Sequence, residues 1–165
     1  LGNFTINHYA GVRIEEDRIL LDVVIDHAEI PAFQARLALD LDDDGVAQGW
    51  CQWGGPEELP NIKHQRVYLK EPTAEPNWRI TCFYVDARHR GRGVARAALE
   101  GAIAQIARAG GGLVEAIPEV TKGRDAHGRF LYSATVELFE DCGFARQRQV
   151  GKHAWIVTAT IEAAT

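Results

Sequence analysis

Apolar and polar positions alternate in two segments near the start of the chain, at 5–14 and 18–26. This period of two predicts two strands, joined by the polar turn Glu15 to Asp17. Residues 28–37 then predict a short helix. The next signal is a hairpin: apolar-rich segments at 38–41 and 46–54 flank an aspartate-rich turn that contains Gly45.

The second half of the chain has longer apolar patterns. Residues 78–85 are almost all apolar, which indicates a strand buried on both faces. Helical spacing of apolar residues predicts a helix over 93–109, ended by three glycines, and a second helix over 132–142. Further strands are predicted over 113–117, 144–150 and 153–161. This order predicts an α/β fold whose central sheet is mixed and partly parallel, flanked by helices.

Composition narrows the possible partners. The 165 residues, of which 46% are hydrophobic, fit a single domain over 1–165. A formal net charge of −5 argues against a specific nucleic-acid partner. No apolar run approaches the ~18 residues of a membrane helix, so we expect no membrane partner and a cytoplasmic location. Neither the three cysteines nor the six histidines show metal-ligand spacing, so we predict no metal site.

The segment between the apolar strand at 78–85 and the following helix carries the clearest chemistry. It consists of Arg88, His89, Arg90, Gly91, Arg92, Gly93, Val94 and Ala95. Glycines let backbone N–H groups point outward, and the start of a helix adds partial positive charge. The turn therefore predicts a site for a phosphate or diphosphate. The alternative is an arginine-rich surface turn without a ligand.

Two segments carry a resemblance to a known family. VDARHRGRGVARAAL (85–99) and VELFEDCGF (136–144) resemble the signature and the late helix of the GNAT superfamily of N-acetyltransferases. The resemblance extends over about residues 39–161. It implies acetyl-CoA as acyl donor, a small-molecule or peptide amine as acceptor, and no metal. The assembly is left open, with a homodimer as one alternative.

The resemblance also implies roles for individual residues. Residues 88–95 would hold the CoA diphosphate, and the strand residues Phe83, Tyr84 and Val85 would hydrogen-bond the pantetheine arm. The family usually has a tyrosine on the late helix, facing the cofactor, that protonates the departing thiolate. Here Phe139 stands at that position and has no hydroxyl. Tyr132 is the alternative acid, although on a helix over 132–142 it would lie about 10 Å away along the axis.

An amine acceptor must lose a proton before it attacks, so the site also needs a base. Glu115 is the first candidate, because it interrupts an apolar strand where burial would raise its pKa. Glu57 and Glu58, in the irregular stretch that follows the hairpin, are alternatives. Each of these three carboxylates could instead be structural. A backbone N–H near Val85 would polarise the thioester carbonyl.

The first 45 residues resemble the extracytoplasmic N-terminal segment of bacterial nickel/cobalt transporter-like proteins. That family's transport residues lie on membrane helices, so no metal function is implied for this chain. The implication is a foreign segment that completes the fold of the GNAT-like domain. Two other functions stay open: a CoA-binding module without catalysis, which Phe139 favours, and a nucleic-acid site at the arginine cluster.

Overall fold

The computed structural model describes residues 6–14, 19–27, 48–71, 74–123 and 131–165. Its strands are β1 (Ile6–Ile14), β2 (Ile19–His27), β3 (Gly49–Gly54), β4 (Trp78–Val85), β5 (Gly112–Ala116), β6 (Ala145–Gln149) and β7 (Trp155–Ile161). Its helices are α2 (Gln65–Tyr68), α3 (Val94–Arg108) and α4 (Val136–Asp141), with one 3₁₀ turn, η1 (Ala87–His89).

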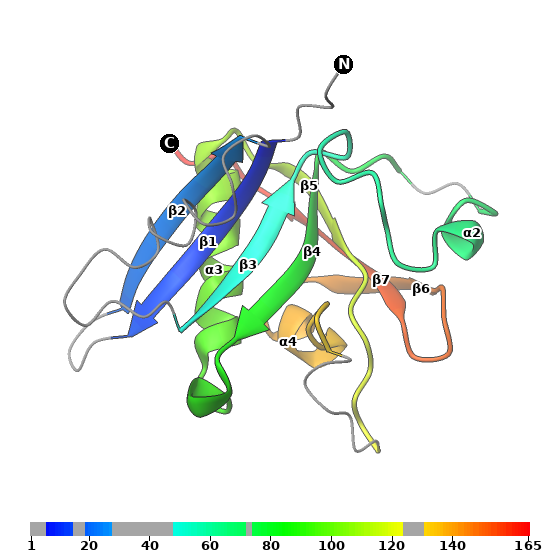
Figure 1. The fold of residues 1–165 in the computed structure, drawn as a ribbon. Helices are drawn as coiled ribbons and strands as arrows, with labels where there is room; N and C mark the ends of the chain where they lie inside the picture. The colour runs from blue at the N-terminus through cyan, green and yellow to red at the C-terminus, as the bar shows by residue number, and fades with distance from the viewer. Residues whose placement is uncertain (1–5, 15–18, 28–47, 72–73, 124–130) are drawn as a thin grey trace.

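All seven strands form one sheet in the order β2-β1-β3-β4-β5-β7-β6 (Figure 1). The pair β4–β5 is parallel, and the other neighbouring pairs are antiparallel. The predicted mixed, partly parallel sheet is therefore confirmed. The two opening strands are confirmed as well, since β1 and β2 pair along their whole length.

Only the second strand of the hairpin predicted over 38–54 lies in the described part of the chain. It forms β3, which has β1 on one edge and β4 on the other. The first strand of that hairpin, at 38–41, and the helix predicted over 28–37 lie outside the described residues.

The parallel pair of β4 and β5 is short. Only Trp78 to Ile80 pair with Val114 to Ala116, and beyond this point the two chains run apart (Figure 1). β5 ends just before Ile117 and Pro118, and a proline has no N–H to continue a ladder. A register shift opposite Gln52 and Trp53 also bends β4 in its middle. The carboxyl-terminal half of β4 therefore has a neighbour on only one edge.

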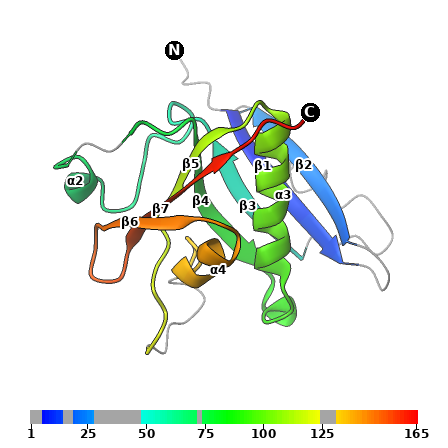
Figure 2. The same ribbon diagram turned by 180° about the vertical axis from the view of Figure 1, so that it is seen from behind.

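The helices α3 and α4 lie on the same face of the sheet (Figure 2). α3 buries Val94, Ala98, Leu99, Ala102 and Ile106, which recur at helical spacing and pack over β1, β3 and β4. The predicted helix over 93–109 is confirmed to within a residue at each end. It ends before Gly110, whose positive φ no helix accommodates.

The second predicted helix is shorter than expected. α4 begins at Val136 rather than at residue 132, because Thr135 is extended and its side chain accepts a hydrogen bond from the Leu138 N–H (3.2 Å). Ala134, with φ of +59°, is likewise outside the helical region. Tyr132 is therefore not on the helix, and its predicted displacement along a helix axis from Phe139 is wrong.

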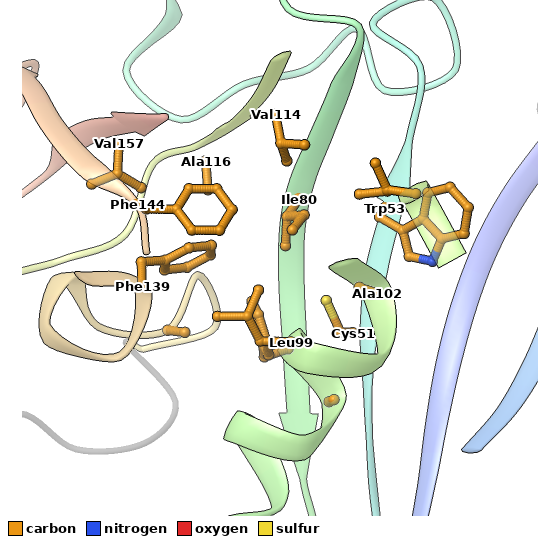
Figure 3. Packing of buried hydrophobic residues seen from close by; sticks show 14 of the residues in the cluster. Cys51, Trp53, Ile80, Leu99, Ala102, Val114, Ala116, Phe139, Phe144 and Val157 are labelled. Atoms are coloured by element: carbon orange, nitrogen blue, oxygen red, sulfur yellow. The ribbon is translucent and has the colours of Figure 1, made fainter. Parts of the chain in front are cut away.

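The main core lies between the sheet and these two helices. Phe139 of α4 lies against Phe144 on one side of β4, and Cys51 and Trp53 of β3 lie on the other side (Figure 3). The ring of Phe139 meets those of Phe83 and Phe144 edge to face, at centroid distances of 5.9 and 4.9 Å. Such pairs stabilise a core beyond the area they bury. The core thus holds both helices against the same face of the sheet.

Candidate active site

The turn after β4 has the conformation that its glycines predict. Gly91 and Gly93 adopt φ of +73° and +84°, which other residues rarely adopt. Asp86 begins the turn and accepts hydrogen bonds from the backbone N–H of Arg88 (2.8 Å) and from its guanidinium (3.0 and 3.1 Å). These bonds lower the pKa of Asp86 to about 2. The Arg88 side chain is thus held by Asp86.

A groove of about 630 Å³ opens at this turn. It lies between the end of β4, the start of α3 and the segment 131–138, which leads into α4. Nine of the predicted cofactor-binding residues line it: Phe83, Tyr84, Val85, His89, Arg90, Gly91, Gly93, Val94 and Ala95. Arg88 and Arg92 do not line it. The turn is open toward the groove, as an anion site requires.

Phe139 was predicted to face the cofactor, and the structure does not bring it there. Its side chain is 0% exposed and lies in the core between Phe83 and Phe144, so it lines neither the groove nor the second cavity described below. Its role is packing. A hydroxyl at this position would be buried among aromatic rings.

The start of α3 offers unpaired donors to the groove. Gly93 is the N-cap, and within the described chain no side chain caps the helix and no acidic residue stands in its first turn. The first N–H groups of a helix have no intrahelical partner. Val94, Ala95 and Arg96 line the groove at this point. An anion bound here would meet these N–H groups and the positive end of the helix dipole.

The open edge of β4 forms one wall of the groove. The Asp86 N–H donates to the carbonyl of Gln48 (2.9 Å) and so points toward the chain of β3. Because backbone N–H and C=O groups alternate in direction along a strand, those of Val85 and Phe83 point away from β3. The Phe83 N–H donates to the Tyr132 carbonyl (2.6 Å). Contrary to the expectation from the sequence, this N–H is therefore already bonded and does not face a pantetheine arm. The Val85 N–H lies two residues further along the same edge.

A second cavity of about 260 Å³ lies where β4 and β5 pair. It is lined by Asn61, Ile62, Lys63, Arg79, Ile80, Thr81, Glu115, Ala116, Ile117, Tyr132 and Ser133. Glu115 is its buried acid, only 2% exposed. The Tyr68 hydroxyl donates to Glu115 Oε2 (3.0 Å), and Arg79 Nε lies 3.5 Å from Oε1.

Burial raises the pKa of Glu115, and the hydrogen bond from Tyr68 and the positive charge of Arg79 oppose that shift. Arg79 forms an ion pair with Oε1 without the geometry of a hydrogen bond. Among the described residues, Oε1 therefore accepts no hydrogen bond. Buried carboxylate oxygens are rarely left in this state, except where they have a function. The predicted base thus lies in the wall of this cavity, with one oxygen bonded to Tyr68 and the other paired with Arg79.

Tyr132 lies between the two cavities, since it lines both. Its side chain is 46% exposed, and its backbone carbonyl is bonded to Phe83 of β4. Neither Glu57 nor Glu58 lines either cavity. Glu58 instead closes a local turn, where its Oε2 accepts a hydrogen bond from the Gly55 N–H (2.8 Å).

No pattern in the sequence predicted a role in the site for Lys63, Arg79 or Ser133. Arg79 is held by the Leu59 carbonyl (3.1 Å), and Lys63 contacts Glu119 and lies 3.4 Å from Ser133 Oγ. These residues lie far apart along the chain and in no recognisable motif. The one available signal was the long irregular stretch after β3, because such stretches are often functional.

A comparison with protein-family models gives one match over most of the chain. The model described as the acetyltransferase (GNAT) family matches residues 22–144. The chain belongs to the GNAT family. The match begins inside the N-terminal segment that resembles transporter-like proteins, and none of the matches supports that second resemblance. Among curated proteins, no sequence matches this GNAT chain.

Solved acetyltransferase structures resemble the chain more distantly. A protein from Corynebacterium glutamicum, described as histone acetyltransferase HPA2 and related acetyltransferase, is 18% identical, with a TM-score of 0.40, over 75% of this chain and 62% of that one. The chain thus spans less than two thirds of that protein. An N-acetyltransferase from Staphylococcus aureus Mu50 is 14% identical, with a TM-score of 0.44, over 73% and 68% of the two chains. Nourseothricin acetyltransferase is 15% identical, with a TM-score of 0.37, over 96% and 86%.

Two further features are absent from the described residues. No helix there has the length and hydrophobicity needed to cross a bilayer. In the same ranges, no three His, Cys, Asp or Glu side chains come together as a metal site would require.

Proposed function

We propose that this GNAT protein transfers an acetyl group from acetyl-CoA to an amine by direct attack, without a covalent enzyme intermediate. The observation that carries the proposal is the meeting of two cavities at Tyr132. One runs to the uncapped start of α3, and the other contains the buried carboxyl of Glu115. A donor and an acceptor can therefore approach one another from different sides of the β4–β5 divergence.

The groove supports binding of the donor. Its diphosphate would accept hydrogen bonds from the N–H groups of the turn at Gly91 and Gly93 and from the first N–H groups of α3. Arg90, which lines the groove, would add charge; its Nε lies 3.4 Å from the Val85 carbonyl. The Val85 N–H would donate to the thioester oxygen, which becomes negative during attack.

The second cavity supports acceptance of the amine and its activation. Glu115 would take a proton from the ammonium form, directly or through water, and the amine lone pair would then form the new C–N bond. The C–S bond breaks as the tetrahedral centre collapses. The Tyr132 hydroxyl would give its proton to the departing thiolate, in place of the tyrosine that the family usually carries where Phe139 stands. The extra proton on the acylated nitrogen would then return to the Tyr132 oxygen, directly or through water, which leaves a neutral amide and a neutral thiol. A thiol pKa of about 8.5 keeps the barrier for this departure modest.

The test is calorimetric titration with acetyl-CoA, followed by release of free thiol in the presence of a panel of amines. We expect micromolar binding and acceptor-dependent release, which Glu115→Gln lowers at least tenfold while donor affinity stays unchanged. Amines that are small molecules or peptides belong in the panel, and so do polyamines and aminoglycosides. Absence of donor binding would refute the proposal.

A second function is a CoA-binding module of the same fold without catalysis. Phe139 favours it, because the usual acid is missing from α4. Tight donor binding without transfer to any amine would support this alternative. A cytoplasmic location, a homodimer and a foreign origin of residues 1–45 remain predictions beside both functions.

A further inference from the structure

Lys63 has no place in the reaction described so far, yet it lies beside Tyr132. Its Nζ is 4.9 Å from the centre of the Tyr132 ring, a cation–π distance. The same Nζ forms an ion pair with Glu119 and lies 3.4 Å from the hydroxyl of Ser133. The side chains of Lys63 and Glu119 are only 16% and 14% exposed. An exposed surface pair would have little value, whereas this one is largely shielded from water.

Tyr132 needs such support because its own segment provides little. It precedes α4 and lies two residues before Ala134, which is in the left-handed region, and nearly half of its side chain is exposed. Backbone bonds fix the main chain: Phe83 N–H to the Tyr132 carbonyl, and Glu119 N–H to the Ala134 carbonyl (3.2 Å). These bonds place the Cα atom but leave the ring free to rotate about its side-chain torsions.

We propose that Lys63 is a positioning residue that holds the Tyr132 ring at the junction of the two cavities. Glu119 holds Lys63 in turn, and its backbone carbonyl also accepts the first N–H of α4, from Val136 (3.0 Å). The ammonium thus links the loop before α2, the chain beyond β5 and the segment before α4. This inference rests on the proposed function, in which Tyr132 protonates the thiolate.

The test is a double-mutant cycle of Lys63→Gln and Tyr132→Phe. General acid assistance contributes about 10²–10⁴-fold, so we expect Lys63→Gln to lower kcat about tenfold to a hundredfold, with the KM for acetyl-CoA within about threefold. In the Tyr132→Phe background the same change should lower kcat less than about twofold. Lys63→Arg, which keeps a cation, should recover most of the rate.

The matched control is Arg146→Gln. Arg146 is also paired with a carboxylate, that of Glu140 (2.6 Å), and also lies over an aromatic ring, that of Trp155 at 5.7 Å. It lines neither cavity. We expect this variant to lose an ion pair without losing kcat.

A second measurement does not depend on activity. Incorporation of 3-fluorotyrosine labels the four tyrosines of the chain, and Tyr132→Phe identifies the signal of residue 132. Lys63→Gln should shift that ¹⁹F signal, and Arg146→Gln should not. A shift in a protein that transfers no acetyl group would overturn the proposed function and retain the positioning role. The positioning role would be overturned by any of three results of Lys63→Gln. These are an unmoved ¹⁹F signal of Tyr132, an equal loss of kcat in the wild-type and Tyr132→Phe backgrounds, or a change confined to the KM of the acceptor.

Discussion

Replacement of Gly91 by valine tests the anion site at its backbone. Gly91 has φ of +73°, and a Cβ built there meets no atom within 4 Å. The substitution therefore causes no clash inside the protein. Its effect comes from the backbone, because a residue with a side chain in the left-handed region costs about 1–2 kcal/mol, and a β-branched residue is a clear outlier there.

The expected loss of affinity follows from how this strain is relieved. If the turn leaves the left-handed region, at least one N–H no longer points into the groove. A hydrogen bond to a charged group contributes about 1.5–3 kcal/mol, and each 1.4 kcal/mol is tenfold in affinity. Losing one such bond should raise the Kd for acetyl-CoA about 10- to 150-fold.

Calorimetric titration measures this change, and Gly110→Val is the matched control. Gly110 also has a positive φ (+106°) with no atom within 4 Å of a Cβ, but it lies at the other end of α3, about 22 Å away at 1.5 Å per residue. Both variants should lose stability, and only Gly91→Val should lose affinity. Equal Kd values for wild type and Gly91→Val would refute the role of the turn, as would an equal loss in the control.

The remaining predictions concern single side chains. Because burial raises the pKa of Glu115, the rate should rise with pH through that raised value, and Glu115→Gln should remove this limb from the pH–rate profile. The raised pKa of Glu115 also stabilises the folded protein below pH about 4.3, the pKa of a glutamate in the unfolded chain. This stabilisation is lost as the pH rises through the pKa of Glu115 in the folded protein. At higher pH, Glu115→Gln should therefore be more stable to denaturation than wild type. Phe139→Tyr should not raise kcat, and it should lower the free energy of unfolding by about 1–3 kcal/mol, since the added hydroxyl would be buried without a partner. Arg88→Ala should leave the acetyl-CoA Kd within about threefold, because Asp86 holds that guanidinium, whereas Arg90→Ala should weaken binding more.

Local patterns in the sequence were enough for the described strands and for α3, but not for α2 or for the start of α4. Apolar spacing gave β1, β2, β4 and α3 to within a residue or two, since each buries a face that its own residues define. The turn at 88–95 was found in the same way, because left-handed glycines before a helix have a local cause. The part of the groove that β4, the turn and the start of α3 form was therefore predictable from one continuous stretch of chain.

Partnerships between distant segments were not predictable from the same patterns. The apolar alternation of β3 predicted a strand, but it failed to indicate that β1 would be a neighbour of that strand. The start of α4 failed for a related reason. A threonine can lie inside a helix or cap its start. Here the backbone of Thr135 is extended and bridges to Glu119, so Thr135 caps α4 and the helix cannot begin earlier.

The sequence by itself determined that a buried strand, a glycine turn and an amphipathic helix follow one another, and that a carboxylate interrupts an apolar strand. Only the tertiary structure decided that Phe139 is core, that Tyr132 lines both cavities and that Lys63 lies over its ring. The physical reason is the range of the interactions. Turn conformation and helix spacing depend on neighbouring residues, whereas a cavity forms where β4 and β5 stop pairing and segments far apart in the chain meet.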